Sequence, residues 1–246
     1  MKPLLLICCL VMGLPFIGNA QKLRIAVAAN AQFVAGVLTK EFKQQTGIEP
    51  ELIVGSSGKF TAQIEQGAPF DVFMSADMKY PEELFAKQLT TAKPQIYAYG
   101  TLVLWSNANV IPTINSLTKA DIKKIAVANP ALAPYGEAAI EALKKLKLYD
   151  QLQPKLVFGE SIAQVNQFLL TDAADAAFTA KSVVMDPAQQ GKGRWTEVDN
   201  KLYKPIAQGV VILKTSTGEN LKQAQKFYKF LFSTKAKQIF KAYGYR

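Results

Sequence analysis

The 246-residue chain carries 29 Lys and Arg against 19 Asp and Glu, a formal net charge of +10, and 49% of its residues are hydrophobic. The basic residues are scattered over predicted helix faces without an extended tract or an aromatic nucleic-acid signature, so we expect a small anion and no nucleic acid as the partner. Histidine is absent, and the two cysteines, Cys8 and Cys9, lie near the N-terminus, which disfavours imidazole, thiol and transition-metal chemistry and most enzyme mechanisms.

The first 20 residues are typical of a secretory signal peptide. Lys2 gives a positive start, an apolar run containing Pro15 follows, and Gly18-Asn19-Ala20 forms a small-residue end. The run is shorter than the roughly 20 unbroken apolar residues of a membrane span. We expect cleavage after Ala20, which leaves an exported protein without cysteine. Lipid tethering is not expected, because no small residue precedes Cys8.

Short β-like runs alternate with helical patterns along the rest of the chain, which is typical of parallel sheets flanked by helices. The first series of predicted strands is LRIAVAA (23–29), ELIV (51–54) and DVFMSA (71–76), with helices over 33–42, over 60–66 and from Pro81 onward. The second series is KKIAVAN (123–129), PKLVF (154–158) and DAAFTA (175–180), with helices near 137–146 and 162–170.

Two longer apolar runs connect the two series. QIYAYGTLVLW (95–105) is predicted to cross from a first lobe to a second, and PIAQGVVIL (205–213) to cross back before a closing helix over 221–231. We therefore predict an α/β protein in which each lobe is a mostly parallel sheet flanked by helices. The first lobe is 21–98 with 207–246, and the second is 99–206. Ligands of open α/β sheets bind at the carboxyl ends of the strands, here in the cleft between the lobes.

Four of the predicted strands end in a small or polar turn that opens a helix. The turns are Ala29-Asn30-Ala31, Gly55-Ser56-Ser57-Gly58, Asn129 through Pro134-Tyr135-Gly136, and Gly159-Glu160-Ser161-Ile162. The first turn of a helix leaves backbone N–H groups without acceptors and carries about half a positive charge. Two such helix starts from each lobe, facing one cleft, predict a site for a compact anion.

The turn GSSGKF (55–60) has two other interpretations. A phosphate-binding P-loop is excluded, because the first glycine of that motif is missing and Phe60 follows Lys59. Ser56 and Lys59 fit the S-x-x-K pattern of serine acyl-transfer enzymes, but Lys214-Thr215-Ser216 lacks the glycine of their K-T-G motif and no S-D-N triplet exists. Such an enzyme remains the less favoured alternative to a binding protein.

The segments AVAAN, VGSSGKF-TAQIEQGAPFDVFMSAD, TLVLWS, ANPALAPYGEAA and GESIAQV, in this order and spacing, closely resemble the periplasmic molybdate-binding proteins of ABC transporters. The resemblance covers essentially the whole chain after the signal. It implies a monomeric type II periplasmic binding protein that holds molybdate or tungstate as a desolvated tetrahedral dianion, through its oxygens and without a cofactor. The implied partners are a membrane permease and its ATPase, and the lobes are expected to close by bending near 99–104 and 207–211. Sulfate or phosphate is the alternative ligand.

The resemblance also assigns the ligands, none of them catalytic. It implies Asn30 with Ala29 at the first turn, Ser57 through its hydroxyl and backbone N–H with Ser56 beside it, and the backbone N–H groups of Tyr135 and Ile162. One branch of the family has a tyrosine ligand where this chain has Ala180, so the resemblance is to the branch that uses Asn at the first turn. Asp71 and Asp77 are implied to be structural, and Lys59 is expected to point to solvent.

Overall fold

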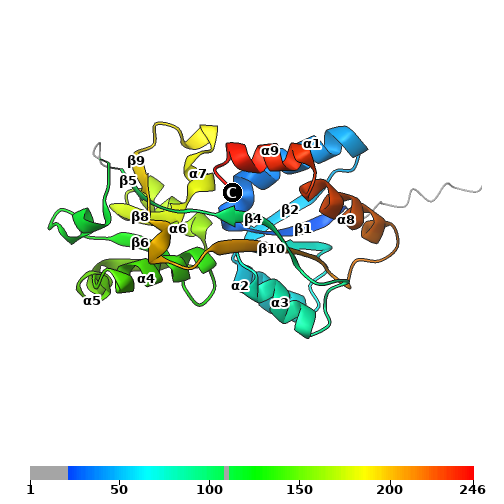
Figure 1. The fold of residues 1–246 in the computed structure, drawn as a ribbon, viewed down its shortest axis with the longest axis horizontal. Helices are drawn as coiled ribbons and strands as arrows, with labels where there is room; N and C mark the ends of the chain where they lie inside the picture. The colour runs from blue at the N-terminus through cyan, green and yellow to red at the C-terminus, as the bar shows by residue number, and fades with distance from the viewer. Residues whose placement is uncertain (1–21, 108–110) are drawn as a thin grey trace, which may run out of the picture.

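The computed structural model describes residues 22–107 and 111–246, and it consists of two α/β lobes side by side (Figure 1). The predicted signal peptide, residues 1–20, lies outside the described residues. Each lobe contains one five-stranded sheet, with the strand orders β2-β1-β3-β10-β4 and β7-β6-β8-β5-β9. In the described part of the chain, no helix has the length and apolar character needed to cross a membrane. The α/β fold of two lobes, predicted from the sequence, is confirmed.

The first lobe has a mixed sheet between two layers of helices. Its strands are β1 (Arg24–Ala28), β2 (Glu51–Gly55) and β3 (Val72–Met74), which are parallel, and β10 (Ile206–Ile212), which runs antiparallel to β3 and to β4 (Gln95–Gly100). One face packs on α1 (Gln32–Thr46), α8 (Gly218–Leu231) and α9 (Thr234–Ala242), and the other on α2 (Ser57–Glu65) and α3 (Lys79–Ala86). Apolar side chains at helical spacing, such as Val34, Leu38 and Phe42, form the buried faces of these helices.

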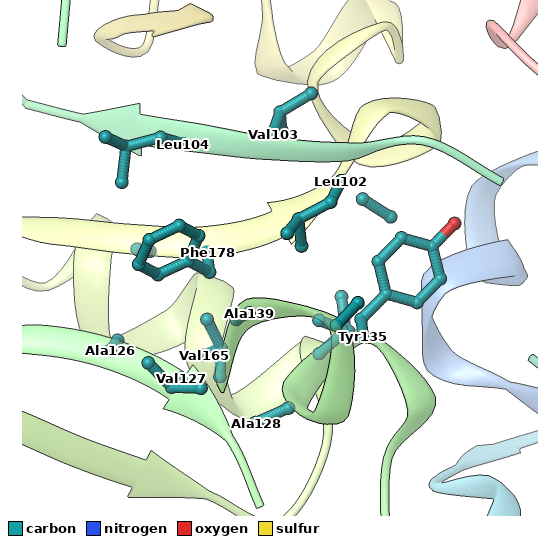
Figure 2. Packing of buried hydrophobic residues seen from close by; sticks show 14 of the residues in the cluster. Leu102, Val103, Leu104, Ala126, Val127, Ala128, Tyr135, Ala139, Val165 and Phe178 are labelled. Carbon is teal, nitrogen blue, oxygen red and sulfur yellow. The ribbon is translucent and has the colours of Figure 1, made fainter. Parts of the chain in front are cut away.

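The second lobe repeats this plan. In it, β6 (Ile125–Ala128) pairs in parallel with β7 (Leu156–Gly159) and β8 (Ala176–Ala180), while β5 (Leu102–Ser106) runs antiparallel to β8 and to β9 (Arg194–Glu197). Its helices are α4 (Pro134–Lys145), α5 (Tyr149–Leu152), α6 (Ile162–Leu170) and α7 (Lys181–Val184). Figure 2 shows its core, in which Leu102 and Leu104 of β5 face Phe178 of β8 and Val165 of α6. Short 3-10 turns lie at Ala29–Ala31, Ile114–Thr118, Gln153–Lys155, Pro187–Gln189 and Asn200–Leu202.

The chain passes between the lobes twice. The predicted run over 95–105 is two strands and not one, because β4 ends at Gly100 in the first sheet and β5 begins at Leu102 in the second. The return path leads from β9 through 198–205 to β10. The exact lobe boundaries given by the sequence, 98/99 and 206/207, remain predictions.

Candidate functional site

The four predicted turns meet at one small cavity between the lobes. Its volume, measured as the space open to the centre of a water molecule, is about 10 Å³. Its lining includes all six residues expected at an anion site: Ala29, Asn30, Ser56, Ser57, Tyr135 and Ile162. Each of these residues is at most 3% exposed. The lining is completed by Ala28, Gly55, Ala76, Ala133 and Pro134. Gly55, Ala133 and Pro134 belong to the predicted turns, whereas Ala28 and Ala76 were not singled out from the sequence.

The cavity lies where strands end and helices begin. In the first lobe β1 ends at Ala28 and leads into the 3-10 turn Ala29–Ala31, and β2 leads through the N-cap Ser56 into α2. In the second lobe β6 leads through a loop to α4, which has Pro134 at its first position, and β7 leads through the N-cap Ser161 to α6. Pro at the first helical position and Ser at the N-cap favour helix starts at these points.

Backbone N–H groups from both lobes surround the cavity. The N–H groups of Ser57, Tyr135 and Ile162 belong to the first turns of α2, α4 and α6, so they have no acceptor within their own helix. Those of Ala29 and Asn30 belong to the 3-10 turn after β1. None of the five donates to a described residue outside its own turn or helix. Five neutral donors at the positive ends of these elements can bind an anion.

Two serine hydroxyls add to this donor set. Ser57 Oγ accepts a hydrogen bond of 3.0 Å from the Ala76 N–H, which leaves the hydroxyl proton of Ser57 free to donate. Ser56 Oγ is buried and has no hydrogen-bond partner among the described residues. An unpartnered buried hydroxyl lowers the stability of the folded protein by about 1–3 kcal/mol. A ligand that accepts a hydrogen bond from this hydroxyl would recover much of that loss.

Asn30 lies on the cavity wall, but its side chain is engaged elsewhere. Its Nδ2 donates to Gln208 Oε1 at 2.9 Å and to Tyr245 Oη at 3.3 Å. Its carbonyl oxygen accepts from Ser182 Oγ at 2.7 Å. The amide hydrogens are thus used within the protein, and the backbone N–H is the donor of Asn30 that is left for a ligand. Gln208 and Tyr245 carried no signal in the sequence, because they are far from the four turns along the chain.

No charged side chain of the described residues lines the cavity. Lys59 Nζ lies 2.7 Å from Glu160 Oε1 of the second lobe, and both side chains are about half exposed. Lys59 therefore forms an ion pair across the cleft instead of pointing freely to solvent. Because Ser56 Oγ has no partner, Lys59 does not act as its base, and the arrangement needed by a serine acyl-transfer enzyme is not formed.

The two aspartates have structural contacts. Asp71 Oδ2 accepts from the Arg24 N–H at 2.7 Å, and Asp77 Oδ1 accepts from Ser75 Oγ at 3.0 Å. Burial raises the pKa of the Asp77 carboxyl from 3.8 to about 6. Among the residues that the structure describes, no group of three or more His, Cys, Asp and Glu is placed to hold a metal ion.

Comparisons with known proteins agree with the fold. The family of bacterial extracellular solute-binding proteins matches residues 23–246. The chain is 40% identical over 238 residues to the molybdate-binding protein ModA of Rhodobacter capsulatus, covering 96% of this chain and 92% of that protein. It is 38% identical over 230 residues to ModA of Azotobacter vinelandii, covering 92% of this chain and 90% of that protein. The solved periplasmic molybdate-binding protein of Azotobacter vinelandii has a TM-score of 0.85 at 34% identity, over 92% of this chain and 99% of that one. This chain belongs to the bacterial extracellular solute-binding protein family.

Proposed function

We propose that this protein captures molybdate or tungstate in the periplasm and delivers it to an ABC importer. The observation that carries the proposal is the cavity between the lobes, which is lined by uncharged donors and contains the unpartnered Ser56 hydroxyl. The similarity to two molybdate-binding proteins, at 40% and 38% identity, supports this choice of ligand.

Capture needs no reaction. A dianion that enters the cavity exchanges its water for the N–H groups of Ser57, Tyr135 and Ile162 and for the serine hydroxyls. Hydrogen bonds to a charged acceptor are roughly twice as strong as those between neutral groups, so uncharged donors are sufficient. The helix starts contribute partial positive charge. A protonated oxyanion would bring an O–H group that finds no acceptor here, so the fully ionised form is selected.

The lobes touch across the cleft, as expected for a closed, ligand-binding form. The Gly58 N–H donates to the Leu132 carbonyl at 2.9 Å, and Tyr80 Oη donates to the Ala131 carbonyl at 3.0 Å. Each bond joins the first lobe to the loop before α4. In our proposal the lobes open and close around the two crossings, and the loaded closed monomer docks on a permease. ATP binds the separate ATPase of the importer, and this chain has no catalytic role and no resident cofactor.

Thermal unfolding of residues 21–246 with molybdate, tungstate, sulfate or phosphate tests the proposal. A ligand that binds only the folded state, present at about 1,000 times its Kd, adds roughly 4 kcal/mol to the free energy of unfolding. For a chain of this size, that gain raises Tm by about 10 °C. We expect this increase with molybdate and tungstate only. A rise of Tm with sulfate or phosphate instead would mean that the protein binds that anion and not molybdate. No rise of Tm with any of the four anions would refute an oxyanion site.

A further inference from the structure

Behind the oxyanion cavity, residues of both lobes meet at one buried glutamine. Gln208 lies on β10, next to the return crossing, and is fully buried. Its Oε1 accepts from Asn30 Nδ2 at 2.9 Å and from Tyr97 Oη at 2.6 Å. Its Nε2 donates to Tyr135 Oη at 3.1 Å. Asn30 and Tyr135 both line the cavity, from opposite lobes, whereas Gln208 itself does not.

The Tyr135 side chain reaches from one lobe into the other. Its backbone is part of α4 in the second lobe, and Figure 2 shows its hydroxyl pointing away from Leu102 and Phe178 toward the blue ribbon of the first lobe. The hydroxyl lies against Gly100, the last residue of β4. A Cβ atom built on Gly100 would be 2.0 Å from Tyr135 Oη and 2.6 Å from Gln208 Nε2. Tyr135, whose backbone N–H lines the cavity, thus places its hydroxyl beside both chain crossings.

The cluster around Gln208 is uncharged. Burial raises the pKa of Tyr97 and Tyr135 well above the usual value for tyrosine, so both phenols stay protonated. Tyr245 adds a further hydroxyl, whose oxygen accepts from Asn30 Nδ2 at 3.3 Å. It is next to the C-terminal residue, and Figure 1 shows the C-terminus between the two lobes. Because buried amides and hydroxyls are costly without partners, the hydrogen bonds of this cluster favour one relative placement of Asn30 and Tyr135.

We propose that Gln208 is a positioning residue of the oxyanion site, which holds Asn30 and Tyr135 of opposite lobes in the closed, binding arrangement through their side chains. This inference rests on the proposed function. Because the Tyr135–Gln208 hydrogen bond joins the two lobes, it favours the closed, loaded form without touching the anion. Its loss speeds the release of the ligand.

The test measures the molybdate Kd and dissociation rate for wild type, Tyr135→Phe and Gln208→Met. The first variant keeps the backbone N–H and the ring of Tyr135 and removes only the hydroxyl, so it is the variant expected to fold normally. We expect Kd to rise about tenfold in Tyr135→Phe, mostly through faster dissociation, since one buried hydrogen bond of the closed form is lost. Gln208→Met is expected to raise Kd at least as much, because it also frees Asn30.

Tyr203→Phe is the matched control. The Tyr203 hydroxyl accepts from the Leu102 N–H at 3.1 Å within the second lobe, so its removal also deletes a buried tyrosine hydrogen bond but none between lobes. We expect a lower Tm for ligand-free Tyr203→Phe and an unchanged Kd.

Gly100→Ala gives a further test. This variant is expected to weaken binding, because the added methyl group clashes with the Tyr135 hydroxyl. Tyr135→Phe in the Gly100→Ala background is expected to restore part of the affinity.

Wild-type affinity in both Tyr135→Phe and Gln208→Met, with molybdate bound by the wild type, would overturn the inference and leave the proposed function intact. An equal loss of affinity in Tyr203→Phe would also overturn it, because the effect would then be general destabilisation. No binding of molybdate by the wild type would instead refute the proposed function, and the inference with it.

Discussion

Ser57 Oγ accepts a hydrogen bond from the backbone N–H of Ala76 at 3.0 Å. Ser57 begins α2 and Ala76 follows β3, and both line the cavity between the lobes. The bond fixes the position of the oxygen and uses it as an acceptor, so the hydroxyl proton remains for a second partner. Ser57 is thereby prepared to donate to an anion through both its hydroxyl and its N–H.

Ser57→Ala is expected to weaken molybdate binding about 10- to 100-fold. The change removes one hydrogen bond to a charged group, worth about 1.5–3 kcal/mol, and leaves the backbone N–H in place. Isothermal titration calorimetry of wild type and variant measures the difference. An unchanged Kd would show that the Ser57 hydroxyl does not contact the anion.

Ser56→Ala is expected to have opposite effects on the free and the loaded protein. The Ser56 hydroxyl is buried without a partner, so its removal should leave the Tm of the ligand-free protein unchanged or higher by a few degrees. If the hydroxyl donates to the bound anion, the rise of Tm on adding molybdate should become smaller in the variant.

Ser216→Ala serves as the control for Ser56→Ala. Ser216 is 3% exposed and its hydroxyl is likewise buried without a partner in the described structure, but it does not line the cavity. Ser216→Ala should change the Tm of the ligand-free protein as Ser56→Ala does, and it should keep the full rise of Tm on adding molybdate. If both variants lost the same part of that rise, a role of Ser56 at the site would be contradicted.

Lys59→Gln is expected to change the molybdate Kd less than about fivefold. The ion pair with Glu160 joins the two lobes at 2.7 Å, but both side chains are about half exposed, and exposed pairs contribute about 0–1 kcal/mol. The small difference should shrink further at high salt. Titrations at low and high ionic strength check this. A loss of tenfold or more that persists at high salt would mean that Lys59 interacts with the anion directly.

Asp77→Asn is expected to raise the stability of the ligand-free protein at pH 7.5 and to have little effect at pH 4. Burial raises the pKa of the folded-state carboxyl from 3.8 to about 6, although the Tyr80 N–H, the Ser75 hydroxyl and Lys79 oppose this shift; Glu137 adds to it. The folded state thus binds the proton more tightly than the unfolded state, and Asp77 costs stability at pH values above about 6.

We expect a gain of about 1 kcal/mol at pH 7.5 for Asp77→Asn, lost as the pH falls through 6 toward 4. The asparagine oxygen can still accept from Tyr80 and Ser75, so the hydrogen bonds of the turn are kept. Urea unfolding of both proteins at several pH values measures the difference. A variant that is less stable at pH 7.5, or equally changed at every pH, would show that the Asp77 charge is not disfavoured.

The four turns could be predicted because their signal is local. Each combines an apolar β run with Asn, Ser, Gly or Pro at its end, and such residues favour helix starts in any context. The helix over 162–170 was predicted with the bounds that the structure shows, since Ser161 caps it and Thr171 follows it. All six residues assigned to the turns by resemblance line one cavity. Their contacts with a ligand remain a prediction.

The features of the fold and the site that could not be predicted depend on contacts between distant parts of the chain. The direction of the Asn30 amide is set by Gln208 and Tyr245, which are 178 and 215 positions away. The run over 95–105 is apolar throughout, so its division at Thr101 follows only from the sheet that each half joins. The edge strand β9, RWTE, is partly exposed and too short to show an alternating pattern.

Crystals of residues 21–246 grown with molybdate, with diffraction data collected at the molybdenum absorption edge, test the central claim most directly. We predict one strong anomalous peak in the cavity between the lobes, with oxygens of the ion in hydrogen-bond contact with Ser57 Oγ and with the N–H groups of Tyr135 and Ile162. A molybdenum peak elsewhere, or an ordered structure with no peak in this cavity, would contradict the account.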